Sequence, residues 1–117
     1  DFGTVAFGVG DEFVPYSAEA AAKIVDVSPQ VEGRPDNFLT YELDRATDES
    51  GVYPVVLISY LQGCMDYADD AKAELVKAYA SYMVSAEGQQ WAAENAGNAP
   101  ISEELRQKAL AIIEQIK

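Results

Sequence analysis

Apolar residues at helical spacing dominate the second half of the chain. One stripe repeats every four residues and is widened by two more: Ala71, Leu75, Tyr79, Met83, Val76 and Tyr82. Three acids crowd its N-terminal end, where the helix dipole favours negative charge: Asp66, Asp69 and Asp70. Because side chains three and four positions apart share one face of a helix, this pattern predicts an amphipathic helix of about five turns.

Two shorter helices are expected after it. Gln89 to Asn95 carries Trp91, which the helical spacing marks as a core residue, and this helix ends at a loop over residues 97–100. Ser102 then has the position of an N-cap for the last helix. The apolar face of that helix is formed by Leu105, Ala109, Ile112, Ile113 and Ile116. Such a face needs another element to cover it.

The first part of the chain favours short elements. Residues 2 to 9 are apolar and β-branched with interspersed glycines, which predicts a buried strand, and Asp11 to Pro15 is expected to be a turn. Ser17 is the expected N-cap of a short helix over residues 18–23. Ile24 to Val27 is interpreted as a brief strand that follows this helix.

Turn chemistry precedes the strongest strand signal. From Ser28 to Gly51 turn residues prevail, while Asn37 to Leu43 alternates and fits either a strand or a single helical turn. Tyr53 to Leu61 is then a continuous apolar, β-branched run that is too short for an ordinary helix. It predicts a central strand buried on both faces, and Pro54 at its beginning is compatible with that position.

Charge and composition exclude several classes of function. Acidic residues number 20 and basic residues 8, and the resulting net charge of −12 repels nucleic acid and anionic lipid surfaces. A single cysteine rules out an intramolecular disulfide, and without histidine the commonest ligand of zinc, copper and iron is missing. We therefore expect no metal site, no cofactor and no catalytic residue, and we interpret Cys64 as a small buried apolar residue. No apolar run is long enough to predict a transmembrane helix.

Three motifs suggest binding, and each has a simpler structural explanation. Phe7–Gly10 contains G-x-G but lacks the third glycine of a dinucleotide site, and two acids follow it that would repel a pyrophosphate. Asp66–Asp70 offers three carboxylates, as a calcium loop begins, without that loop's glycine and distal glutamate. Like Glu103 and Glu104, these acids are expected in the first turn of a helix.

Three segments in a particular order carry a resemblance to a known family. They are the strand-like Tyr53–Tyr60, the run Ser85-Ala86-Glu87-Gly88-Gln89 after a helix, and Ala96-Gly97-Asn98-Ala99-Pro100 before a closing amphipathic helix. This succession resembles the end of the phosphate-binding protein of ABC-type phosphate transporters. The chain departs from the family pattern at Asn98, where an aromatic residue is usual, and at Ile101-Ser102, which replaces Leu-Pro.

The resemblance implies an α/β fold and a division into parts. The chain would be the C-terminal fragment of a two-lobed periplasmic-binding-protein-like fold, with few strands plus three C-terminal helices. Residues 1–46 would be the tail of the second lobe, residues 47–52 the hinge and residues 53–117 the return segment of the first lobe. The hinge residues would be Thr47, Asp48, Glu49, Ser50 and Gly51. The family's phosphate contacts come from earlier segments, so no ligand-binding residue is assigned in this chain.

The function that the resemblance implies is binding without catalysis. The full-length protein would be an extracytoplasmic, lipid-anchored lipoprotein that delivers inorganic phosphate to the permease of an ABC importer. Helix faces left uncovered in a fragment, such as that of Ile112, Ile113 and Ile116, predict self-association. Three alternatives stay open: a binding protein for sulfate or molybdate, a phosphatase-like relative, and a structural interaction domain.

Overall fold

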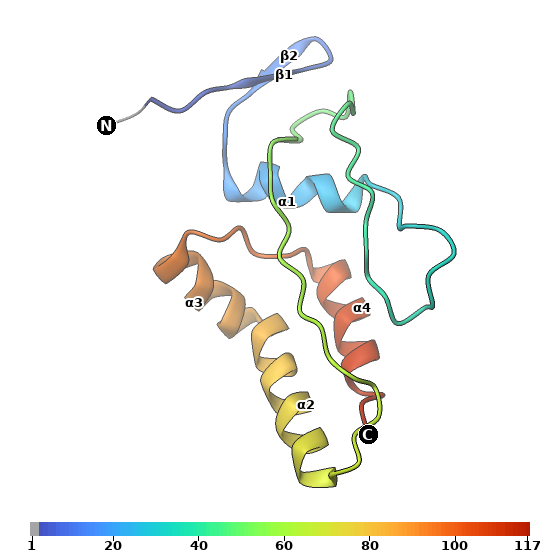
Figure 1. The fold of residues 1–117 in the computed structure, drawn as a ribbon. Helices are drawn as coiled ribbons and strands as arrows, with labels where there is room; N and C mark the ends of the chain where they lie inside the picture. The colour runs from blue at the N-terminus through green and yellow to red at the C-terminus, as the bar shows by residue number, and fades with distance from the viewer. Residues whose placement is uncertain (1–2) are drawn as a thin grey trace. The chain divides into compact units, whose positions relative to one another are not determined.

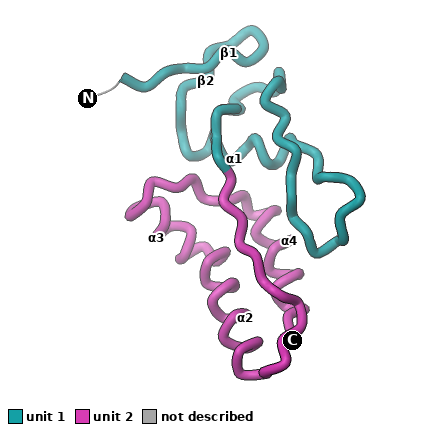
Figure 2. The backbone as a smooth tube through the Cα atoms, viewed as in Figure 1, with its two compact units in different colours: residues 1–57 teal, residues 58–117 magenta. Residues whose placement is uncertain are grey.

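The computed structural model describes residues 3–117. They form two compact units, one up to residue 57 and one from residue 58, which Figure 2 colours separately. Four helices and one two-stranded sheet make the described chain a small mixed α/β protein, in agreement with the predicted class (Figure 1). The predicted hinge segment over residues 47–52 lies within the first unit and not at the division between the units.

The first unit opens with a β-hairpin. Strands β1 (Phe7–Val9) and β2 (Glu12–Val14) pair antiparallel, with Val9 opposite Glu12. Gly10 has a φ of 55° and Asp11 a negative φ, as the two central residues of a type II′ turn do. The predicted strand over residues 2–9 is therefore shorter than expected, and its residue 2 lies outside the described residues. The predicted turn over residues 11–15 is mostly β2, because the hairpin needs only two residues to reverse.

Helix α1 (Ala18–Asp26) is longer than its sequence pattern predicts. Ser17 is its N-cap as predicted, and the Ser17 hydroxyl accepts a hydrogen bond from the Ala20 N–H at 3.0 Å. The brief strand predicted over residues 24–27 is wrong, because α1 continues through it. Ile24 lies four residues after Ala20 on the same face of the helix and is 0% exposed. The apolar side chain of Ile24 is thus explained by burial on one face of α1 and not by a strand.

A small core joins the hairpin to α1 and to the chain at residue 53. Val9, Val14 and Ala20 are buried together, and Tyr53 packs against them. The Tyr53 ring makes edge-to-face contacts with Phe7 and Tyr16, with ring centroids 6.3 and 5.7 Å apart. The Tyr53 N–H also donates to the Ala20 carbonyl at 2.9 Å, so backbone and side chain position this residue together.

The loop between α1 and residue 53 contains one short pairing of extended chain. Gln30 and Tyr41 form an isolated antiparallel bridge, the Val31 N–H donates to the Thr40 carbonyl, and both bonds beside the bridge are 2.9 Å long. The second bond runs from the Glu42 N–H to the Pro29 carbonyl. Neither possibility for residues 37–43 holds over the whole stretch: Asn37 belongs to a turn, and Tyr41 pairs only in this isolated bridge.

The buried central strand predicted over residues 53–61 does not form. This stretch has no strand neighbour in the described chain, and the Val55 and Leu57 side chains are 55% and 96% exposed. A strand is stable only where a second backbone meets its N–H and C=O groups. The apolar, β-branched composition is present, but the partner it requires is not among the described residues.

The second unit is formed by three helices. They are α2 (Asp70–Val84), α3 (Ala86–Ala96) and α4 (Glu103–Ile113), and α2 contacts both of the others (Figure 1). Ser102 caps α4 as predicted, and α3 begins three residues earlier than the predicted start at Gln89. Two backbone bonds, from the Tyr67 N–H to the Lys117 carbonyl and from the Lys117 N–H to the Met65 carbonyl, join the chain before α2 to the residue after α4.

The packed face of α2 is not the one that the apolar stripe predicts. Ala73 and Ala80, seven residues apart, are the buried residues of this helix. In the predicted stripe Val76 is half-buried, while four large side chains are exposed and form what we call the apolar face of α2: Leu75, Tyr79, Tyr82 and Met83. Small side chains let two helices approach closely, whereas Leu and Tyr side chains would hold them apart. On α4 the prediction fares better, since Ile113 is buried and Ile112 and Ile116 are half-buried.

We expect the Ile24→Ala substitution to lower the free energy of unfolding by about 2–5 kcal/mol, because it leaves a cavity at a fully buried position. Val5→Ala is the control, since Val5 is exposed and should change stability by no more than about 0.5 kcal/mol. Urea unfolding followed by circular dichroism measures both. Equal losses in the two variants would contradict the position assigned to Ile24.

Candidate functional site

The helix N-termini are the first places to look for an anion site in a chain of this composition. An oxyanion binds at a helix N-terminus because the first N–H groups are unpaired and the helix dipole is positive there. In each helix of the described chain a side chain already occupies this position. The cap hydrogen bonds join Ser17 Oγ to Ala20 N (3.0 Å), Asp69 Oδ1 to Ala71 N (2.9 Å), Ser85 Oγ to Gly88 N (3.0 Å) and Ser102 Oγ to Leu105 N (3.2 Å).

Acidic side chains in the first turns add to this effect. Every helix of the described chain has at least one: Glu19, Asp70, Glu87, and Glu103 with Glu104. These carboxylates interact favourably with the helix dipole and repel a second anion from the same place. The N-termini therefore stabilise the helices and are unsuited to binding phosphate.

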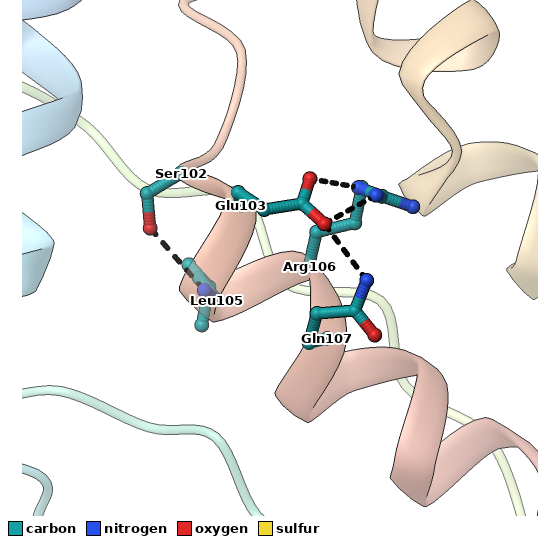
Figure 3. A network of polar contacts seen from close by, with 5 residues as sticks. All are labelled: Ser102, Glu103, Leu105, Arg106 and Gln107. Carbon is teal, nitrogen blue, oxygen red and sulfur yellow. Dashed lines mark hydrogen bonds and ion pairs between the residues drawn. The ribbon is translucent and has the colours of Figure 1, made fainter.

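The N-terminus of α4 shows how the charges are compensated locally (Figure 3). The Glu103 carboxylate accepts hydrogen bonds from Arg106 Nε and from Gln107 Nε2, both at 2.7 Å. The hydrogen bond from Arg106 and then that from Gln107 hold the pKa of Glu103 below the usual glutamate value. A hydrogen bond from Lys108, together with its positive charge, lowers the pKa of Glu104 in the same way. These predicted first-turn acids are thus partners of cations on their own helix.

Most of the eight basic side chains have a partner within the chain: a carboxylate, an aromatic ring or backbone carbonyls. Lys23, Lys77 and Lys108 lie 3.7, 3.5 and 2.8 Å from the carboxylates of Glu19, Glu114 and Glu104 respectively. Lys72 lies over the Tyr67 ring, with its Nζ atom 5.9 Å from the ring centroid. Arg45 donates to two backbone carbonyls. Binding of an anion by these groups would require giving up contacts that they already make.

The acidic run over residues 66–70 is explained by capping. Asp69 is the N-cap of α2 and accepts hydrogen bonds from the N–H groups of Ala71 and Lys72. No group of three or more side chains suited to a metal ion occurs within residues 3–117. The G-x-G sequence over residues 7–10 is likewise explained by the hairpin, in which Gly10 supplies the positive φ of the turn.

The predicted hinge, Thr47 to Gly51, is a turn attached to the β-hairpin. Gly51 has a φ of 73°, and its N–H donates to the Glu12 carboxylate at 2.6 Å. The Thr47 hydroxyl accepts a hydrogen bond from the Glu49 N–H at 3.2 Å. The next residue, Val52, is 0% exposed. The turn is thus held at its end by one charged hydrogen bond and one buried side chain, and its role as a hinge stays a prediction.

Two expectations about exposed side chains are wrong. Cys64 was expected to be buried and is exposed, because it lies in an irregular segment before α2 where its backbone N–H donates to the Tyr67 hydroxyl. Trp91 was expected in the core and is 59% exposed on α3, since the packed positions of that helix are taken by small residues such as Gly88. Neither side chain contributes to a site in the described chain.

The corner between α2 and α3 has the most specific geometry in the second unit. The Cβ atom of any residue larger than glycine at position 88 would clash with the Tyr82 carbonyl oxygen. Gln89 joins two segments: its Nε2 atom donates to the Met83 carbonyl at 2.8 Å, and its Oε1 atom accepts from the Ile101 N–H at 2.9 Å. Gly97 ends α3 in a left-handed conformation, with a φ of 70°.

The contacts that Gln89 and Arg45 make with distant residues were not predicted from the sequence. The run Ser85–Gln89 was noted for its resemblance to a family, and its glycine near a helix start was the signal of a close backbone approach. The link from Gln89 to Ile101 and the contact of Arg45 with distant carbonyls had no such signal, because both join residues far apart in sequence.

Comparison with known proteins adds no relative. No protein-family model, curated protein or solved structure matches the chain. Within the described residues, no helix has the length and apolar composition needed to cross a membrane.

We expect Gly88→Ala to lower the free energy of unfolding by about 1–3 kcal/mol, because the backbone must shift to relieve the contact with Tyr82. The gain of about 1 kcal/mol in helix propensity only partly offsets this. Gly3→Ala is the control, since a Cβ atom there meets nothing within 4 Å. Urea unfolding of the second unit, followed by Trp91 fluorescence, decides the outcome. Unchanged stability in the Gly88 variant would show that the corner is loosely packed.

The lowered pKa values at α4 predict paired responses to mutation. Arg106→Ala should raise the pKa of Glu103 and leave that of Glu104 in place, and Lys108→Ala should do the reverse. Folding lowers the pKa values of both glutamates, so their ionised forms stabilise the folded state. This stabilisation is complete at pH values above the ordinary glutamate pKa and is lost as the pH falls through the lowered pKa. Carboxyl-carbon NMR titrations measure each group separately. Equal shifts of both glutamates in either variant would refute the pairing.

Proposed function

We propose that this chain is the C-terminal part of an extracytoplasmic phosphate-binding protein that delivers inorganic phosphate to the permease of an ABC importer. In this proposal the chain is scaffold: it takes part in a two-lobed receptor, and other segments hold the anion. Binding and delivery, without catalysis, are its role. A lipid anchor on the full-length protein places it at the outer face of the membrane.

The corner between α2 and α3 is the observation that carries the proposal. Two of the segments that resemble the family, Ser85–Gln89 and Ala96–Pro100, lie at the two ends of α3, and Gln89 accepts a hydrogen bond from the N–H of Ile101, the residue directly after the second segment. Ser85 caps α3, Gly88 admits the Tyr82 carbonyl, and Gly97 ends the helix. Four residues of the resembling segments, Ser85, Gly88, Gln89 and Gly97, thus have specific structural tasks at the ends of α3, which supports reading these segments as a motif.

The distribution of charge supports the assignment of the anion site to other segments. The helix N-termini of the described chain are capped and acidic, and most basic side chains already have partners, so these groups are poorly placed to replace the hydration of a phosphate ion. The exposed, strand-like segment over residues 53–57 supports the same proposal, because a return strand of the first lobe would find its neighbours in the remainder of that lobe.

Calorimetry tests the proposal on two polypeptides. The 117-residue chain should bind phosphate no more tightly than a dissociation constant of about 1 mM, whereas a product extended by the coding sequence upstream should bind it at about 1 μM or better. The physical reason is that the donors that enclose the anion lie in the added segments.

Two further titrations and one enzyme assay distinguish the alternatives. Tighter binding of sulfate or molybdate than of phosphate by the extended product would reassign the ligand, and release of phosphate from a chromogenic ester would reassign the class. Absence of any oxyanion binding by the extended product would contradict the proposal, as would micromolar binding of phosphate by the 117-residue chain alone.

A further inference from the structure

We draw no further inference here: the strongest candidate, the exposed apolar face of α2 in the second unit, which the proposed function leaves unassigned, carries no proposal because nothing within residues 3–117 shows what covers it.

Discussion

Hydrogen bonds between residues that are close in sequence are the interaction on which this structure depends. Each helix of the described chain begins at a residue whose side chain accepts a hydrogen bond from the first turn, and the hairpin reverses over two residues. The large side chains that are fully buried among the described residues are Ile24 and Val52, both in the first unit. With so little apolar material buried, caps and turns carry a larger share of the stability than they do in a larger domain.

The same local contacts use groups that an anion site would need. A cap or a first-turn acid stabilises a helix by using the N–H groups and the positive potential that an anion site would need. The pairs that Arg106 and Lys108 make with Glu103 and Glu104 use basic side chains in the same way. An oxyanion bound at one of these places would have to displace contacts that these groups already make.

Two exposed apolar surfaces remain, and they differ in what they can do. The apolar face of α2 belongs to a helix whose backbone is already paired, so only its side chains gain from being covered. Within residues 53–57, Val55 and Leu57 have unpaired backbone groups in addition to exposed side chains, so covering them satisfies both requirements. A hydrophobic stripe is non-directional, whereas a strand edge specifies direction and register. The strand-like segment is consequently the more specific of the two surfaces.

The sequence by itself determined the mixed α/β class of the fold, the presence of its helices and the caps at Ser17 and Ser102. A helix satisfies its backbone hydrogen bonds within one segment, and its start depends on a side chain that bonds to an N–H three residues away. Tertiary structure alone decided that Ala73 and Ala80, and not Leu75 and Tyr79, face the neighbouring helices. It also decided that residues 53–61 form no strand pairing within the described chain. Periodicity records that a side chain favours apolar surroundings, but the surface that supplies them, like the neighbour that a strand requires, comes from elsewhere in the chain.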